Sequence, residues 1–154
     1  MPTRLMRRFD KEIVSMPNKA TREAIGLVGC EINATESPTA QALRLLAIVE
    51  TFGEEQTLSL PSLGIEASEG PDGKIASVHL HSRGHEGFEA FPFEFNGVTF
   101  ESDETEVRLR LGDPTAAGEG SDGPWSRYEF GNWYIHFAHS RQSGLLCLVT
   151  CAIP

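Results

Sequence analysis

The chain has 154 residues, of which 40% are hydrophobic and 23% charged, and its formal net charge is −9. These proportions are ordinary for a folded domain and exclude an intrinsically disordered chain. A chain of this length buries roughly 68–70% of the surface that its unfolded form exposes, so it needs no metal or disulfide for stability. We therefore expect one folded domain and no cofactor.

The charge is unevenly distributed along the chain. Residues 1–23 hold six basic and three acidic side chains, whereas residues 24–154 hold seven basic and 19 acidic ones. The acidic part repels phosphate groups, which argues against nucleic acid as a partner, and it attracts basic proteins. The simpler alternative is that the acidic surface only keeps the protein soluble.

No segment indicates secretion or a membrane. The basic start of the chain is not followed by an apolar run of signal-peptide length, and no stretch approaches the ~20 apolar residues that span a bilayer. The three cysteines, Cys30, Cys147 and Cys151, are odd in number and lack the spacing of a metal site. Buried free thiols in a reducing compartment explain them, so we expect a cytoplasmic protein with no membrane partner.

Residues 1–34 predict an N-terminal helical segment. An apolar residue recurs every four positions over residues 3–14, which is typical of one face of a helix. A second short helix is predicted from Lys19 to Val28, where Gly29 ends it. The apolar positions of the first helix are Leu5, Phe9 and Ile13.

Residues 35–97 are predicted to form a first helix-plus-sheet half. Ser37 is a good N-cap and Pro38 suits the first helical position, so a helix is expected to run as far as Gly53. The expected apolar face of this helix comprises Ala42, Leu45, Val49 and Phe52, widened by Leu46 and Ile48. Extended segments are predicted at residues 58–60, 63–67 and 74–82, with a turn at Pro71-Asp72-Gly73.

Residues 83–97 connect the two halves and are rich in aromatic side chains. Glycines and Pro92 disfavour regular structure there. So many aromatic side chains are not left in water, so we expect them to pack between the halves. They are Phe88, Phe91, Phe93 and Phe95.

Residues 98–154 are predicted to form the second half. Val107 and Leu111 have helical spacing, and the sequence Leu-Gly-Asp-Pro at residues 111–114 ends that helix. Extended segments are predicted at residues 125–130, 133–139 and 145–153, and the last is apolar on both faces, so it is expected in the middle of the sheet. The predicted fold class is α+β, an antiparallel sheet packed by short helices in one domain over residues 1–154. The similar order of elements in the two halves raises the alternative of an internal duplication.

His79, His81 and His85 form the most site-like cluster in the sequence. His79 and His81 are expected on the water-facing side of one extended segment, which is how strands often present metal ligands. The sequence places no carboxylate or cysteine to complete a site, and His85 falls in a loop. We therefore expect surface histidines and no metal.

No catalytic motif is present. The sequence lacks Gly-x-Ser-x-Gly, a glycine-rich phosphate loop, His-Glu-x-x-His and Cys-x-x-Cys. His136 and His139 are three residues apart and are expected on opposite faces of their strand, so they cannot act together. We therefore expect a protein that is not an enzyme.

Acidic and aromatic residues predict a surface that binds a partner. Acidic side chains gather in residues 50–72 and 101–122, which would ring one end of the molecule if the halves are duplicated. Such a field accelerates association with a basic partner, and Trp and Tyr are enriched in interface hot spots. The alternative is a solvated acidic rim with aromatic side chains in the core. The expected partner-binding residues are Glu54, Glu55, Glu69, Asp72, Glu104, Glu119, Asp122, Trp125, Tyr128 and Tyr134.

Five short motifs resemble small bacterial immunity proteins of polymorphic toxin systems. They are Lys-Ile-Ala-Ser-Val at residues 74–78, Phe-Asn-Gly-Val-Thr-Phe at 95–100, Leu-Gly-Asp-Pro at 111–114, Trp-Ser-Arg-Tyr at 125–128 and Tyr-Ile-His-Phe at 134–137. The helix that ends in Leu-Gly-x-Pro before a sheet is also similar to small outer-membrane assembly lipoproteins and to β-lactamase-inhibitor-like folds. Those proteins need a signal peptide, and the lipoproteins a lipid-bearing cysteine, which this sequence does not show.

The resemblance implies binding and supplies no catalytic residue. It implies an immunity protein that binds and neutralises a cognate bacterial toxin by occluding the active site of that toxin. The acidic surface implies that the toxin is basic. The alternative is a non-enzymatic structural or assembly adaptor protein.

Overall fold

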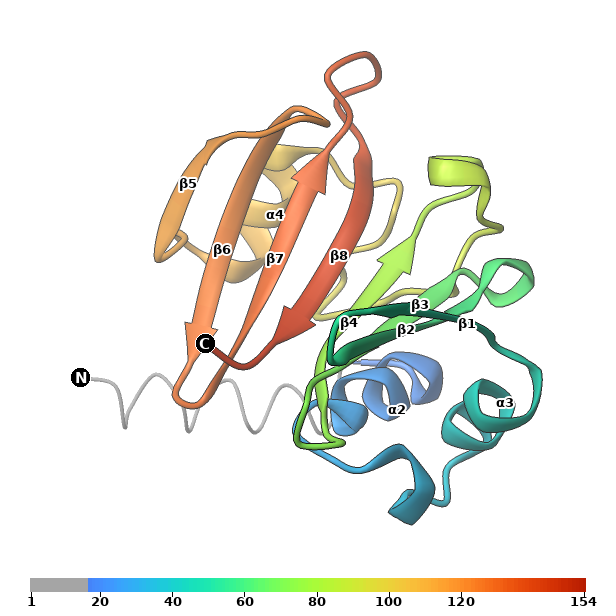
Figure 1. Cartoon of the computed structure of the whole chain (residues 1–154). Coiled ribbons are helices and arrows are strands. Elements are labelled where there is room, and N and C mark those ends of the chain that lie inside the picture. Colours follow the sequence, from blue (N-terminus) through green and yellow to red (C-terminus); the bar gives the residue numbers. More distant parts are fainter. Residues whose placement is uncertain (1–16) are drawn as a thin grey trace.

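Eight antiparallel strands form one continuous sheet in the order β1-β2-β3-β4-β8-β7-β6-β5 (Figure 1). The computed structural model describes residues 17–154, so the helix predicted over residues 3–14 lies outside the described residues. The strands are β1 (Ile48–Phe52), β2 (Glu55–Leu60), β3 (Ile65–Glu69), β4 (Ile75–His81), β5 (Ala116–Glu119), β6 (Pro124–Phe130), β7 (Trp133–His139) and β8 (Leu146–Ala152).

Three α-helices, α2 (Lys19–Leu27), α3 (Pro38–Leu46) and α4 (Glu104–Leu111), occur in the described part of the chain. Each begins at a capping side chain that accepts a hydrogen bond from a backbone N–H three residues further on, namely Asn18, Ser37 and Asp103. Single turns of 3₁₀-helix cover Ile32–Ala34, Pro61–Leu63 and His85–Gly87. The fold is therefore α+β, with more sheet than helix.

All three helices lie on one face of the sheet. Figure 1 shows α2 and α3 below the β1–β4 part and α4 behind the β5–β8 part. The hydrophobic core fills the space between these helices and the sheet, and it includes Phe91, Phe93 and Phe95 of the connection between β4 and α4. The prediction that this aromatic connection packs inside is confirmed, and Phe88 is also buried.

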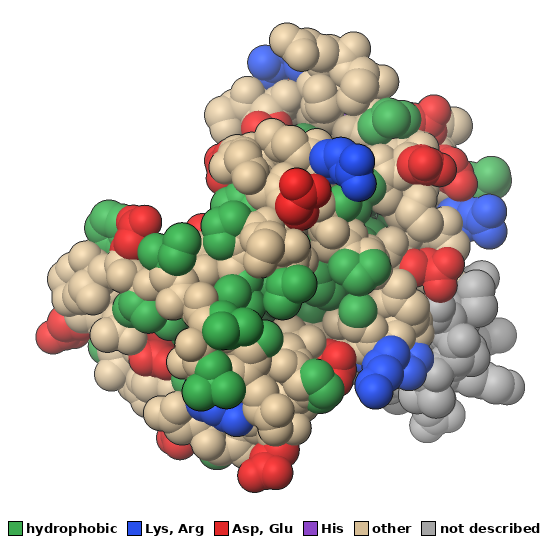
Figure 2. Space-filling view, turned by 90° about the vertical axis from the view of Figure 1, so that its right-hand side faces the viewer, with side chains coloured by type: hydrophobic (Ala, Val, Ile, Leu, Met, Phe, Trp, Pro, Cys, Tyr) green, Lys and Arg blue, Asp and Glu red, His purple; other side chains and the backbone are tan. Residues whose placement is uncertain are grey.

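The other face of the sheet carries no helix among the described residues. The two parts of the sheet meet at an angle where β4 pairs with β8, and the views in Figures 1 and 2 agree that the helix-free face lies inside this bend. We call it the open face. It comprises the side chains of β2, β3, β4, β6, β7 and β8 that alternate with the core-facing side chains and point away from the helices. Its central row is Ser59, Glu66, His79, Thr150, His136 and Arg127.

The helix predicted from Ser37 to Gly53 is too long. It ends at Leu46, and residues 48–52 form the edge strand β1, which turns at Gly53 into β2. The β-branched and aromatic residues of this segment favour a strand, and this tertiary pairing overrides the helical spacing. Leu45, Val49 and Phe52 are consequently exposed by 81%, 53% and 63% rather than buried. Hydrophobic side chains also gather on the side of the molecule seen in Figure 2.

Other predictions about the sheet hold. The α2 and α4 helices, the turn before β4 and the tight hairpin between β6 and β7 are where the sequence placed them, and β8 is central. The edge strand β5 was missed because its small residues carry no alternation. Cys147 and Cys151 are buried free thiols, but Cys30 is exposed, contrary to expectation.

The strand order is symmetric about the β4–β8 border, with four consecutive strands on each side. Among residues 17–154, two α-helices precede β1, and α4 alone lies between β4 and β5. An internal duplication is not shown by this symmetry and stays a prediction.

Gly64 comes directly before β3 and packs closely against the backbone of the aromatic segment. It has a φ of +70°, and a Cβ there would clash with the backbone of Glu89 and Phe91.

Gly64→Ala is expected to lower the free energy of unfolding by about 3 kcal/mol, because the left-handed conformation and the clash both add strain. Gly73→Ala is the matched control, since Gly73 has a φ of +77° and no atom within 4 Å of an added Cβ. We expect about 1 kcal/mol there. Urea denaturation measures the free energy of unfolding of both variants. Equal losses of stability would show that the structure relieves the clash at Gly64.

Candidate functional site

Aromatic and polar side chains line the β5–β8 part of the open face. The Trp125 indole stacks on the His136 ring with centroids 5.0 Å apart, and the Arg127 guanidinium lies 3.7 Å from the centre of the Tyr134 ring. All four side chains are half-buried in the free protein. They are rigid and amphipathic, which are the properties that suit a residue to anchor a protein partner.

Neutral histidines occupy the middle of the open face. Nδ1 of His79 lies 3.0 Å from Oγ1 of Thr150, and its Nε2 lies 3.1 Å from Oγ of Ser77. Burial lowers the pKa of His79 and of His136, so both imidazoles are held in the uncharged form. This part of the face is therefore polar and able to form hydrogen bonds, but it is not strongly charged.

The predicted acidic residues do not lie at one end of the molecule. Because all neighbouring strands are antiparallel, the β1–β2 and β3–β4 turns lie at one end of the strands and the β5–β6 loop lies at the other. The prediction of a single acidic end is therefore wrong. One end carries Glu54, Glu55, Glu69 and Asp72, and the opposite end carries Glu119 and Asp122. The open face lies between these two acidic ends.

Several of these carboxylates have partners within the chain. Glu119 lies 3.4 Å from Arg141, Asp122 lies 3.3 Å from His85, and Asp72 accepts a hydrogen bond from the N–H of Lys74. Glu54 is exposed and has no ion pair among the described residues. The field of the acidic ends is thus partly neutralised, most of all beside the β5–β6 loop.

Two of the predicted partner-binding residues lie on the wrong side of the sheet for that role. Tyr128 is 4% exposed, and its hydroxyl donates a hydrogen bond of 2.8 Å to the carbonyl of Gly112 at the end of α4. Burial raises the pKa of Tyr128 to about 12. Glu104 begins α4, which covers the core face. Both residues are separated from Trp125 and Tyr134 by the sheet itself.

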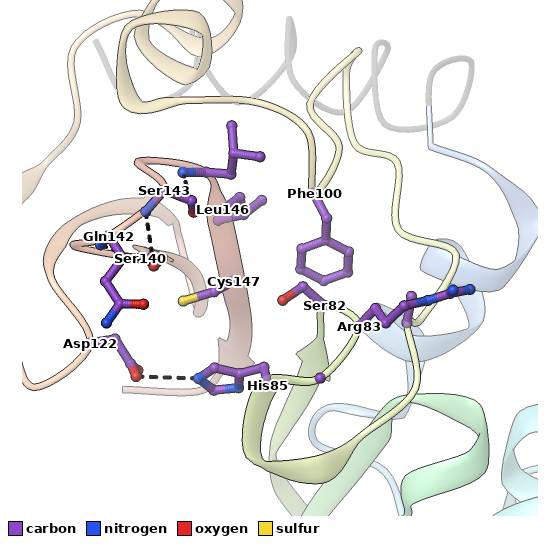
Figure 3. Close-up of a pocket in the computed structure, with 13 residues that line it drawn as sticks. Ser82, Arg83, His85, Phe100, Asp122, Ser140, Gln142, Ser143, Leu146 and Cys147 are labelled. Atoms are coloured by element: carbon purple, nitrogen blue, oxygen red, sulfur yellow. Dashed lines mark hydrogen bonds and ion pairs between the residues drawn. The ribbon is translucent and has the colours of Figure 1, made fainter.

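A cavity of about 570 Å³ lies at the end of the sheet where β4 finishes and β8 begins. Figure 3 shows His85, Asp122 and Cys147 together on its wall, from three segments far apart in the sequence. Nε2 of His85 lies 3.3 Å from Oδ1 of Asp122, and Sγ of Cys147 lies 3.3 Å from the carbonyl oxygen of Ala138, to which the thiol donates. Burial raises the pKa of the Cys147 thiol to about 11, so it is not an activated nucleophile.

His81 is buried, contrary to the prediction that it shares a water-facing side with His79. It is 1% exposed because the connection after β4 folds over it: Phe88 stacks on its ring with centroids 3.8 Å apart. Its Nδ1 lies 2.9 Å from Nδ1 of His85. Burial and then the neighbouring His85 lower the pKa of His81 to about 4, so the ring is neutral at physiological pH. The three histidines thus form no common metal site, since His79 points to the open face.

Two groups within residues 17–154 bring three metal-ligating atoms within 4.8 Å of one another. They share His85 and combine it either with His81 and Glu86 or with Asp122 and Cys147. The sequence could not predict the second group, because only the antiparallel pairing of β4 with β8 and the path of the β5–β6 loop bring these residues together.

No protein-family model matches the chain. Its sequence also has no detectable similarity to a curated protein. Solved structures do match. A cysteine-rich secretory protein from Staphylococcus aureus superposes with a TM-score of 0.55 at 12% identity over 83% of this chain, which spans only 44% of that protein. A DUF4309 family protein from Bacillus subtilis superposes with a TM-score of 0.50 at 13% identity over 89% of this chain and 100% of its own length.

Identities this low show a shared fold and nothing further. None of the helices among the described residues is both long enough and apolar enough to cross a bilayer.

Proposed function

We propose that this chain is an immunity protein, which binds a cognate basic toxin and neutralises it by covering the active site of that toxin. The observation that carries the proposal is the open face, a concave sheet surface that holds half-buried Trp125 and Tyr134 on its β6 and β7 strands and has acidic residues at both ends. The five short motifs that resemble immunity proteins favour this class over other classes of binding protein.

The shape of the open face supports binding to a folded protein. A sheet paired along eight strands is rigid, so little conformational entropy is lost when a partner covers it. Trp125 and Tyr134 offer large amphipathic surfaces that are already held by His136 and Arg127. A preorganised surface of this kind suits the tight binding that neutralising a toxin requires.

The charges support a basic partner. Glu54, Glu55 and Asp72 are exposed at one end of the strands, and Glu119 is exposed at the other. With a net charge of −9, the chain attracts a cationic protein over distances of the order of the ~8 Å Debye length at physiological salt. The acidic ends would then flank the bound toxin on two sides. We place this binding in the cytoplasm, where the free thiols persist.

Two features of the described residues agree with a binding role that involves no catalysis. The thiol of Cys147 is held protonated and bonded to a backbone carbonyl, and His81 is uncharged and inaccessible. Neither residue is poised as a nucleophile or a general base. The symmetric strand order supports the further proposal that the two halves arose by duplication.

The experiment is a co-expression rescue. The protein encoded beside this chain is expressed from an inducible promoter, alone or with this chain, and colony survival is counted. We expect this chain to restore survival and to co-purify with that protein. Persistent killing in cells that contain the soluble chain contradicts the proposal. Co-purification with a protein that is not toxic would instead favour the adaptor.

A further inference from the structure

The wall of the cavity at the end of β4 and β8 gathers a set of side chains that zinc prefers. His85 comes from the 3₁₀ turn after β4, Asp122 from the β5–β6 loop and Cys147 from β8 (Figure 3). Imidazole nitrogen, carboxylate oxygen and thiolate sulfur are the three ligand types of protein zinc sites. The proposed function needs neither His85 nor Cys147, and Asp122 enters it only as one charge of an acidic end.

The distances suit a single ion. Zinc bonds of about 2.0–2.3 Å in tetrahedral geometry place neighbouring ligand atoms roughly 3.3–3.6 Å apart. Nε2 of His85 and Oδ1 of Asp122 are 3.3 Å apart, and the three ligand atoms lie within 4.8 Å of one another. The contact between imidazole and carboxylate already has the required length, so only the Cys147 side chain has to move closer.

His81 positions His85 for this role. Its Nδ1 lies 2.9 Å from Nδ1 of His85, while its ring is fixed beneath Phe88. When His85 donates its Nδ1–H to His81, its Nε2 is left with a lone pair that faces the Asp122 carboxylate. Two acceptors at 3.3 Å repel each other unless a proton or a metal cation lies between them. Most histidines that bind a metal donate their other N–H to a neighbouring acceptor in this way.

The sulfur is inside the protein but borders the cavity. Cys147 is 7% exposed, and the cavity that it lines also contains hydroxyl groups from Ser82, Ser140 and Ser143. The fourth coordination position would face this cavity, where a water molecule completes the tetrahedron. A site with three protein ligands and one open position is the arrangement in which zinc keeps an exchangeable ligand.

We propose that His85, Asp122 and Cys147 bind one zinc ion, with His81 as the positioning residue for His85. On binding, Zn²⁺ replaces the proton on the thiol, and this proton is released to solvent, so Cys147 becomes a thiolate and its hydrogen bond to Ala138 is lost. The ion would tie three separate segments together at one end of the sheet.

The test is calorimetric titration of the full chain with zinc sulfate after removal of metal with a chelator. We expect one zinc per chain, and an affinity at least about tenfold lower in Cys147→Ser and in Asp122→Asn. Cobalt(II) provides a second readout, since a thiolate ligand gives a charge-transfer band that Cys147→Ser should abolish. Asp122 lies in a loop with a side chain that is 37% exposed, so Asp122→Asn keeps the test informative if Cys147→Ser does not fold.

Matched controls separate this site from the alternatives. Cys30→Ser and His79→Ala alter a cysteine and a histidine outside the cluster and are expected to keep zinc affinity within about twofold, well below the loss for a true ligand. Glu86→Gln tests the other candidate group, which combines His85 with His81 and Glu86. The proposal is overturned if the chain binds no zinc. It is also overturned if Glu86→Gln weakens zinc binding while Asp122→Asn leaves the affinity unchanged.

Discussion

Trp125→Ala is expected to weaken binding of the proposed toxin partner about thirtyfold, which corresponds to about 2 kcal/mol. Trp125 lies on the open face near the start of β6, and its indole is already fixed against His136. A partner that covers the open face buries the remaining surface of this ring without having to order it. Truncation to alanine removes that buried area and leaves a hollow in the interface. Titration calorimetry with the purified toxin measures the change.

Leu109→Ala is the control for this variant. Leu109 is 82% exposed on α4, which lies on the opposite side of the sheet, so its truncation is expected to leave the affinity unchanged. Both variants should keep the thermal stability of the parent within a few degrees. Equal affinities for the Trp125→Ala protein and the parent, with a loss in Leu109→Ala, would move the binding surface to the helices.

Phe137→Ala is expected to lower the free energy of unfolding by about 3–5 kcal/mol. Phe137 is 0% exposed on the core side of β7, and its ring meets Tyr128 edge-on with centroids 5.8 Å apart. It also lies 6.3 Å from Phe93 of the aromatic connection, so its loss opens a cavity where the two halves of the chain meet. The melting temperature should fall by on the order of 10 °C. Differential scanning calorimetry measures this shift.

Phe52→Ala makes the same truncation at the surface. Phe52 is 63% exposed on the edge strand β1, so we expect a change of no more than about 0.5 kcal/mol. A comparable loss in both variants would mean that β1 is covered in solution, and a small loss in Phe137→Ala would contradict the position of the core.

The sequence predicted elements wherever local signals and burial agreed. Ser37 caps α3, Pro71-Asp72-Gly73 forms the turn before β4 and the apolar run of β8 lies inside the sheet, so each local signal agrees with the fold. The elements α2, β4 and β8 lie where they were predicted. The prediction of helix after Leu46 was wrong because the helical spacing of this segment competes with the strand preference of its β-branched residues. Pairing with β2 decides in favour of the strand. The short strand β5 pairs with β6 through small residues that carry no pattern of their own.

The binding surface was predictable only in part. Trp125 and Tyr134 both lie on the open face, as expected of anchors, but Tyr128 is in the core because it has the opposite parity on β6. The acidic turns were expected at one end, and the antiparallel directions of the strands separate them. The approach of Cys147 to His85 depends on β4 pairing with β8 although residues 82–145 separate the two strands, and no local pattern encodes it.

The measurement that tests the central proposal most directly is hydroxyl-radical labelling of side chains in the complex with the toxin. We predict that Trp125 and Tyr134 become protected on binding, whereas Leu109 on α4 and Leu45 on α3 are labelled as in the free protein. Unchanged labelling of Trp125 and Tyr134 in a stable complex, with protection of the helices instead, would contradict binding through the open face.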